Sequence, residues 1–157
     1  MMARRQHSER GLTLVELVVS FTILSLLCTM AVPLARYKVR RDQERDLRWA
    51  LHEMRTAIDK YKDDADAGKI TPGKIESYNY PESLEQLVEG VKAAGKVDVK
   101  LKYLRRIPKD PMTNSNDWGK RSMQDDPKST SFGGQNVFDV FTKSTNMGSD
   151  GTPYSEW

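Results

Sequence analysis

The chain contains a long uninterrupted run of apolar residues close to its amino terminus. The run extends from Leu12 to Ala35, and Glu16 is its only charged side chain. As a helix, about 24 residues rising 1.5 Å each are about 36 Å long, enough to cross the hydrocarbon core of a bilayer. The pattern therefore predicts one membrane-spanning helix.

The carboxylate of Glu16 needs a reason to lie at the start of this run. Inside hydrocarbon it costs about 3 kcal/mol or more, so a buried glutamate usually has a cationic partner. Arg10 is six residues away and is expected to face water. A new amino terminus at Leu12, made by cleavage after Gly11, would supply a cation on a neighbouring copy. A plain single-pass anchor with Glu16 at the membrane interface is the alternative.

After the apolar run the pattern becomes amphipathic. Pro33 removes one helical hydrogen bond and predicts a kink or weak point. Apolar residues then recur at spacings of three and four, which predicts a helix whose apolar stripe packs on its own head domain. His52 is expected on the surface of this helix. The stripe consists of Leu47, Ala50, Leu51, Met54, Ala57, Ile58 and Tyr61.

The remaining chain predicts short elements joined by loops. Residues 80–90 predict a short helix, with Ser83 and Gln86 spaced as a capping box and Gly90 as the stop. Val97, Val99 and Leu101 alternate with polar residues, which predicts a brief strand or an exposed edge. The strongest strand prediction is 136–142, with 118–123 as its partner.

Composition narrows the function classes. The 157 residues leave about 120 for one small domain after the leader and span. The net charge of +3 gives little support for nucleic-acid binding, and the single cysteine, Cys28, allows no intramolecular disulfide. His7 and His52 belong to no recognisable nucleophile and base set, so no catalytic residues are predicted.

Two other kinds of signal fit the amino terminus less well. A secretory signal peptide has a shorter apolar region without a glutamate. A lipoprotein signal ending at Cys28 would need a small residue in place of Leu27. The positive-inside rule gives no orientation, since basic residues flank the run on both sides.

The amino-terminal residues resemble a type IV prepilin signal: a short basic leader, Gly11, Leu12, Thr13, Leu14 and then Glu16. The resemblance implies that prepilin peptidase cleaves between Gly11 and Leu12 and methylates the new terminus. It also implies that Glu16 pairs with the terminal amine of a neighbour during assembly. Pro33 resembles the proline of pilin helices, around which the helix is thought to melt on assembly.

Three further segments resemble the major pseudopilin of type II secretion, so that the likeness covers nearly the whole chain. They are Tyr80-Pro81, the segment from Tyr103 to Pro111, and Asp150-Gly151. There are two departures from that family. Met112 to Asp117 intervene before Trp118-Gly119, and the acidic end of the chain is shortened.

This resemblance implies an α+β, type IV pilin-like fold. A long amino-terminal helix, with a membrane half and an amphipathic half, packs on a small domain with a short helix and a small antiparallel sheet. The expected divisions are a cleaved leader at 1–11, a transmembrane and assembly helix at 12–35, its amphipathic continuation at 36–66, and a head at 67–157.

The implied function is structural rather than enzymatic: a single-pass inner-membrane subunit, with its head in the periplasm, that polymerises into the type II secretion pseudopilus. The implied partners are further copies, minor pseudopilins, prepilin peptidase, a membrane assembly platform and, indirectly, a cytoplasmic ATPase. A type IV or DNA-uptake pilin is the alternative, and an anchored binding module that never polymerises is a third hypothesis.

The resemblance also implies a calcium ion at the carboxy-terminal loop. Asp150 matches the first acidic ligand of the family, and Glu156 lies near the second; an ordinary solvated turn is the alternative. A further open pair of hypotheses concerns Arg105, Arg106, Lys109 and Asp110. These residues form either an intersubunit ion-pair patch or a solvated turn, because exposed ion pairs contribute only about 0–1 kcal/mol.

Overall fold

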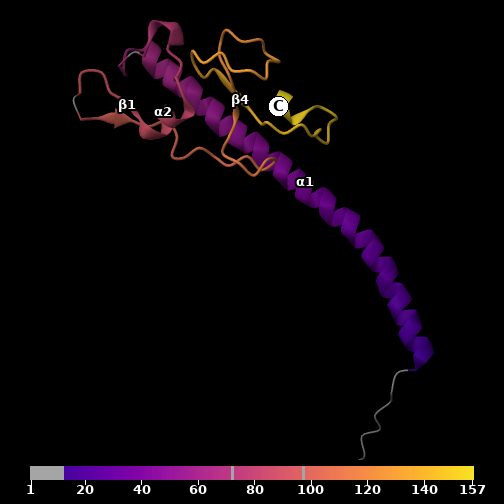
Figure 1. Cartoon of the computed structure of the whole chain (residues 1–157). Coiled ribbons are helices and arrows are strands. Elements are labelled where there is room, and N and C mark those ends of the chain that lie inside the picture. The colour runs from indigo at the N-terminus through magenta and orange to yellow at the C-terminus, as the bar shows by residue number, and fades with distance from the viewer. Residues whose placement is uncertain (1–12, 72, 97) are drawn as a thin grey trace, which may run out of the picture. The chain divides into compact units, whose positions relative to one another are not determined.

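The structure, a computed structural model, describes residues 13–71, 73–96 and 98–157 (Figure 1). Helix α1 comes first and is followed by short helices and strands. In chain order the elements are α1 (Leu14–Asp66), η1 (Ile75–Ser77), α2 (Leu84–Glu89), β1 (Val91–Lys92), β2 (Lys100–Leu101), β3 (Gly119–Arg121), β4 (Asp139–Phe141) and η2 (Tyr154–Glu156). The predicted α+β fold, with a long first helix and a small domain, is confirmed.

The chain divides into two units, residues 1–40 and residues 41–157. In the first unit, the large apolar side chains of α1 from Leu14 to Leu34 whose exposure is known are 50–78% exposed. Pro33 lies inside α1, which continues across it. The hydroxyls of Thr22 and Thr29 donate to main-chain oxygens one turn earlier in the helix, so these polar groups are satisfied within an apolar surface.

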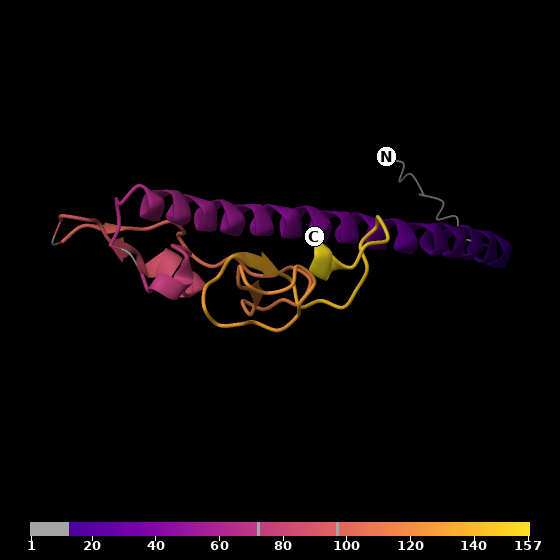
Figure 2. The same ribbon diagram turned by 90° about the horizontal axis from the view of Figure 1, so that it is seen from above.

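In the second unit, the predicted stripe of α1 forms the core, as expected. All seven of its residues are at most 5% exposed, and His52 lies on the solvent side. The rest of this unit lies along one side of the helix in Figure 2. The buried residues that it adds to the core include Leu87, Leu104, Trp118, Val137 and Val140. The helix is thus held in this unit by burial of one face.

Two small antiparallel sheets complete the second unit. The predicted pairing of the strands near residues 120 and 140 is confirmed: Lys120 lies opposite Val140 in the β3–β4 pair. The ladder is shorter than 136–142 because the Val137 amide donates to Pro81 O instead, at 2.7 Å. The β1–β2 pair includes only the end of the predicted 97–101 strand, and its partner β1 was not predicted. The Ser83 cap is confirmed, since its side chain accepts from the Gln86 amide at 3.4 Å.

Gly119 is required by close packing between the strands of the β3–β4 pair. A Cβ atom at this position would lie 2.4 Å from ring atoms of Phe141, which is far inside van der Waals contact. Phe141 itself is only 3% exposed and has the guanidinium carbon of Arg121 4.0 Å from its ring centroid. The glycine therefore lets a large aromatic side chain lie flat on the strand.

Asp110 has a structural role that the sequence did not reveal. It is fully buried, and its carboxylate accepts hydrogen bonds from the Met112 amide at 2.8 Å, the Thr113 hydroxyl at 2.9 Å and the Thr142 hydroxyl at 2.5 Å. The first two bonds shape the turn after Pro108, and the third ties that turn to the residue following β4. Asp110 is therefore not part of a solvated patch with the neighbouring basic residues.

Asp110→Ala is expected to lower the free energy of unfolding by about 2–4 kcal/mol, since it leaves buried donors unpaired. Urea denaturation of the detergent-solubilised chain measures this change. Asp117→Ala is the matched control: its carboxylate is exposed and pairs with Lys143, so a loss below about 1 kcal/mol is expected. Equal losses in both variants would contradict the role of Asp110.

Candidate functional site

The start of α1 is organised by the residues that the prepilin resemblance emphasised. The Glu16 amide donates to Thr13 Oγ1 at 3.3 Å, and the Leu17 amide donates to Thr13 O at 3.1 Å. Thr13 therefore caps the helix: its hydroxyl accepts from the Glu16 amide, which has no main-chain partner in the first turn, and its carbonyl accepts the first helical hydrogen bond. Glu16 lies in this first turn, where the helix dipole favours a negative charge. Gly11 and Leu12 lie outside the described residues.

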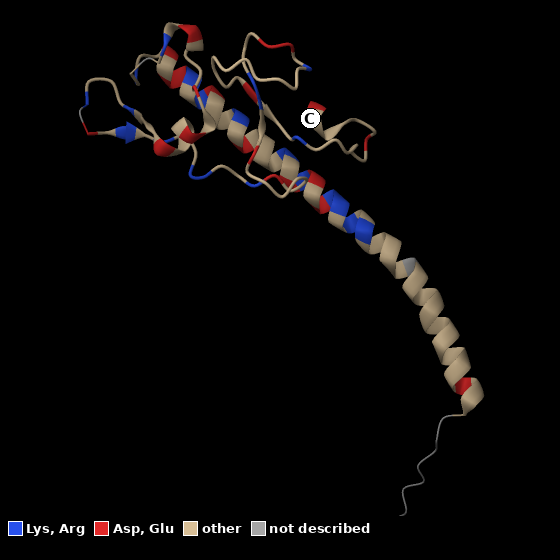
Figure 3. Ribbon diagram, viewed as in Figure 1, with Lys and Arg blue, Asp and Glu red and all other residues tan. Residues whose placement is uncertain are grey.

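Beyond this turn, α1 presents an uncharged surface of membrane-spanning length. In the sequence, Glu16 is followed by no further charged residue through Ala35, and a basic group begins at Arg36. Figure 3 shows the same succession along α1, with red near its start, then a tan stretch, then blue. The helix is long and apolar enough to cross a bilayer, and none of the described side chains in its most apolar stretch is buried. So large an apolar surface needs a cover, which lipid or other subunits can supply.

Comparison with known proteins adds a decisive observation at this place. Residues 6–32 match the family model described as the prokaryotic N-terminal methylation motif. The chain carries a type IV pilin-like prepilin signal. No curated protein and no solved structure matches the chain. The motif supports the pilin and pseudopilin family without separating its secretion and pilus branches.

The prepilin signal indicates the broad class of the protein. It indicates a pilin-like subunit that is processed by prepilin peptidase and assembles into a filament. The single apolar helix and the signal together fit a single-pass inner-membrane protein. A pilin-like family also favours a structural role over an enzymatic one. The assembly roles of Glu16 and Pro33 stay predictions.

The carboxy-terminal loop is held to α1 by a buried carboxylate that sequence reasoning missed. Glu44 is 6% exposed. Its Oε1 accepts from the Ser149 amide at 2.8 Å and the Tyr154 hydroxyl at 2.9 Å, and its Oε2 accepts from the Ser149 hydroxyl at 2.6 Å. Glu44 lies three residues before Leu47, so it continues the apolar stripe of the helix. A carboxylate on the buried face of a helix is the sequence signal that could have predicted a buried polar contact here.

Arg55, further along α1, links the same loop and β4 to the helix through hydrogen bonds. Its Nε donates to Asp139 Oδ1 at 2.8 Å, and its Nη2 donates to the main-chain oxygens of Val140 at 3.1 Å and Trp157 at 2.7 Å. Asp139 also accepts from Arg121 Nη1 at 3.2 Å. One planar guanidinium thus links the helix, the strand and the last residue.

Asp150 and Glu156, the predicted calcium ligands, each face a cationic side chain. Asp150 Oδ1 accepts from the Thr152 amide at 3.0 Å and hydroxyl at 2.7 Å, and Oδ2 lies 3.6 Å from Arg48 Nη2. The bonds from Thr152 lower the pKa of Asp150, with a smaller contribution from Arg48. Glu156 Oε1 lies 3.9 Å from Lys128 Nζ.

This arrangement fits calcium poorly, because the ion takes six to eight oxygen ligands and commonly more than one carboxylate. Within the described ranges, no three acidic, histidine or cysteine side chains gather at one place. Arg48 also covers the loop, with its guanidinium carbon 4.2 Å from the Trp157 ring centroid. The residues do not form a calcium ligand set in this structure, and calcium binding stays a prediction.

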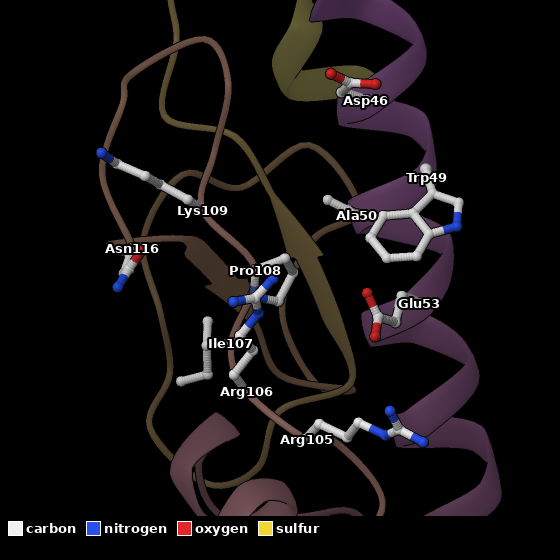
Figure 4. Close-up of a pocket in the computed structure, with 10 residues that line it drawn as sticks. All are labelled: Asp46, Trp49, Ala50, Glu53, Arg105, Arg106, Ile107, Pro108, Lys109 and Asn116. Atoms are coloured by element: carbon white, nitrogen blue, oxygen red, sulfur yellow. The ribbon is translucent and has the colours of Figure 1, made fainter.

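A cavity of about 840 Å³ separates α1 from the segment before Asp110 (Figure 4). Asp46, Trp49 and Glu53 line it from the helix, and three basic residues line it from the facing segment. Those three, Arg105, Arg106 and Lys109, have no hydrogen bond or ion pair to any described side chain. Trp49 is 63% exposed. The residues that line the cavity include no nucleophile paired with a base. Whether its basic residues form an intersubunit ion-pair patch or a solvated turn stays open.

Glu44→Ala is expected to reduce the free energy of unfolding by about 2–4 kcal/mol equally in calcium and in a calcium chelator, since three donors lose their acceptor. Thermal melts of the full chain in both buffers measure this. Asp150→Ala should cost less than about 1 kcal/mol in both, because its carboxylate is exposed. A Tm that calcium raises in the unmodified chain but not in Asp150→Ala would instead establish the calcium site.

Proposed function

We propose that this chain is the major structural subunit of a type II secretion pseudopilus. The observation that carries the proposal is the exposed apolar surface of α1 behind a prepilin signal, with Glu16 in its first turn. A secretion role, rather than a pilus role, is supported by the resemblance of Tyr80-Pro81, the 103–111 segment and Asp150-Gly151 to the major pseudopilin.

The proposed mechanism is mechanical. Prepilin peptidase cleaves after Gly11 and methylates Leu12, and the Glu16 carboxylate of one copy pairs with the terminal amine of another. Such a heterologous contact does not close on itself, so it propagates into a helical fibre. An assembly platform and a cytoplasmic ATPase supply the work, minor pseudopilins join the fibre, and the growing fibre pushes folded proteins outward from the periplasm.

A type IV or DNA-uptake pilin is the second candidate, since it shares the leader and helix. Such pilins commonly close their terminal region with a cysteine pair, whereas this chain has the single Cys28 within its apolar run. In the second unit, Glu44 and Arg55 hold the terminal region by hydrogen bonds instead. This difference favours the secretion branch.

A deletion strain separates the two candidates. We expect loss of the proteins normally released into the medium, with surface pili unchanged in amount, because a pseudopilus serves export alone. Released proteins are measured by gel and mass spectrometry, and pili are sheared from the cells and quantified. Lost pili or lost DNA uptake with normal secretion would support the pilus candidate. No change in either output would favour an anchored binding module.

Glu16→Ala is expected to abolish fibre assembly while leaving the head folded and the chain in the membrane. The charge removed is the one proposed to pair with a neighbour's amine, and hydrocarbon tolerates alanine better than a carboxylate. Electron microscopy of fibres from an overproducing strain measures assembly, and membrane fractionation measures insertion. Glu85→Ala, at an exposed position of α2, is the matched control. Fibres of normal length from Glu16→Ala would refute the pairing.

A further inference from the structure

A compact group of cations follows the apolar run on α1. Arg36, Lys38 and Arg40 stand at alternate positions directly after Ala35, and all three are exposed. With 3.6 residues in each turn, Lys38 points away from the side shared by Arg36 and Arg40. The three side chains, termed the basic collar, therefore place positive charge around the helix rather than on one face.

The collar carries a local excess of positive charge that the rest of the cleaved chain does not have. Residues 36–40 carry a net charge of +3, whereas the whole second unit, residues 41–157, has 19 basic and 20 acidic residues. Between Leu12 and Ala35 the only charged side chain is that of Glu16. Because the second unit is almost neutral, the positive potential is concentrated next to the apolar run.

The collar also lies at a defined depth along the helix. From Leu14 to Ala35 the helix rises about 33 Å, close to the thickness of a bilayer's hydrocarbon core. The residues that follow are thus expected at the level of the lipid headgroups. Tyr37, within the collar, is 68% exposed. An exposed tyrosine beside basic residues is typical of the boundary between membrane and water.

We propose that the basic collar binds the headgroups of anionic phospholipids on the side of the membrane where the second unit lies. The proposal rests on the membrane location in the proposed function. Near an anionic surface, each cation strengthens binding by about fivefold, an effect that salt weakens. The collar would hold an unassembled subunit at a fixed depth, and extraction into a fibre would have to break these contacts.

The test uses the full chain in neutral detergent micelles and native mass spectrometry. Phosphatidylglycerol and phosphatidylcholine with identical acyl chains are the probes. We expect at least about tenfold tighter binding of phosphatidylglycerol, decreasing as ionic strength rises. The triple variant Arg36→Gln, Lys38→Gln, Arg40→Gln should lose this preference. The matched control Lys92→Gln, Lys96→Gln, Lys100→Gln removes the same charge from exposed positions elsewhere and should keep it.

Three results would overturn the proposal: equal binding of both lipids by the unmodified chain, a preference that survives in the triple variant, or an equal loss in the control. Displacement of phosphatidylglycerol by millimolar inorganic phosphate would show a free-phosphate site instead. If the triple variant kept its lipid preference but formed fewer fibres, the cations would face a neighbour's carboxylates. Normal secretion in a deletion strain would refute the secretion role and leave the lipid result standing.

Discussion

The constraint on which the rest depends is that the first half of α1 has no cover within its own unit. Its large apolar side chains are at least half exposed from Leu14 to Leu34 wherever their exposure is known. Water is an unfavourable environment for such a surface, so the chain is committed to lipid or to other subunits. Lipid and protein are about equally apolar, so exchanging one for the other changes the hydrophobic free energy little. Polar groups at the two ends, Glu16 and the cations from Arg36 onward, therefore have a large influence on that exchange.

The second half of the same helix stabilises a small domain that has no disulfides. Its apolar stripe forms the core, while Glu44 and Arg55 reach from the helix to the carboxy-terminal loop and β4. The strands themselves are two or three residues long, and so few ladder bonds cannot organise a domain. The helix is therefore the scaffold, and buried polar contacts decide where the loops attach to it.

The parts that could be predicted from sequence were those with a repeating pattern or a local rule. The stripe from Leu47 to Tyr61, the Ser83 cap and the pairing of residues near 120 and 140 each depend on spacing, and each is confirmed. Asp110, Glu44 and Arg55 could not be assigned, because each has a partner that lies 32 to 110 residues away in sequence. A buried charge is chosen by tertiary contacts, which no single-sequence pattern records.

The carboxy-terminal loop shows how side chains on a neighbouring helix can hold a loop in place. Charged side chains on an adjacent helix can order a loop through charge-assisted hydrogen bonds. Here Glu44 accepts from both Ser149 and Tyr154, and Arg48 lies between Asp150 and the Trp157 ring. These groups are supplied by α1 itself. The loop and the charged residues of the helix thus form one consistent arrangement, in which the loop's order depends on the fold of its own domain.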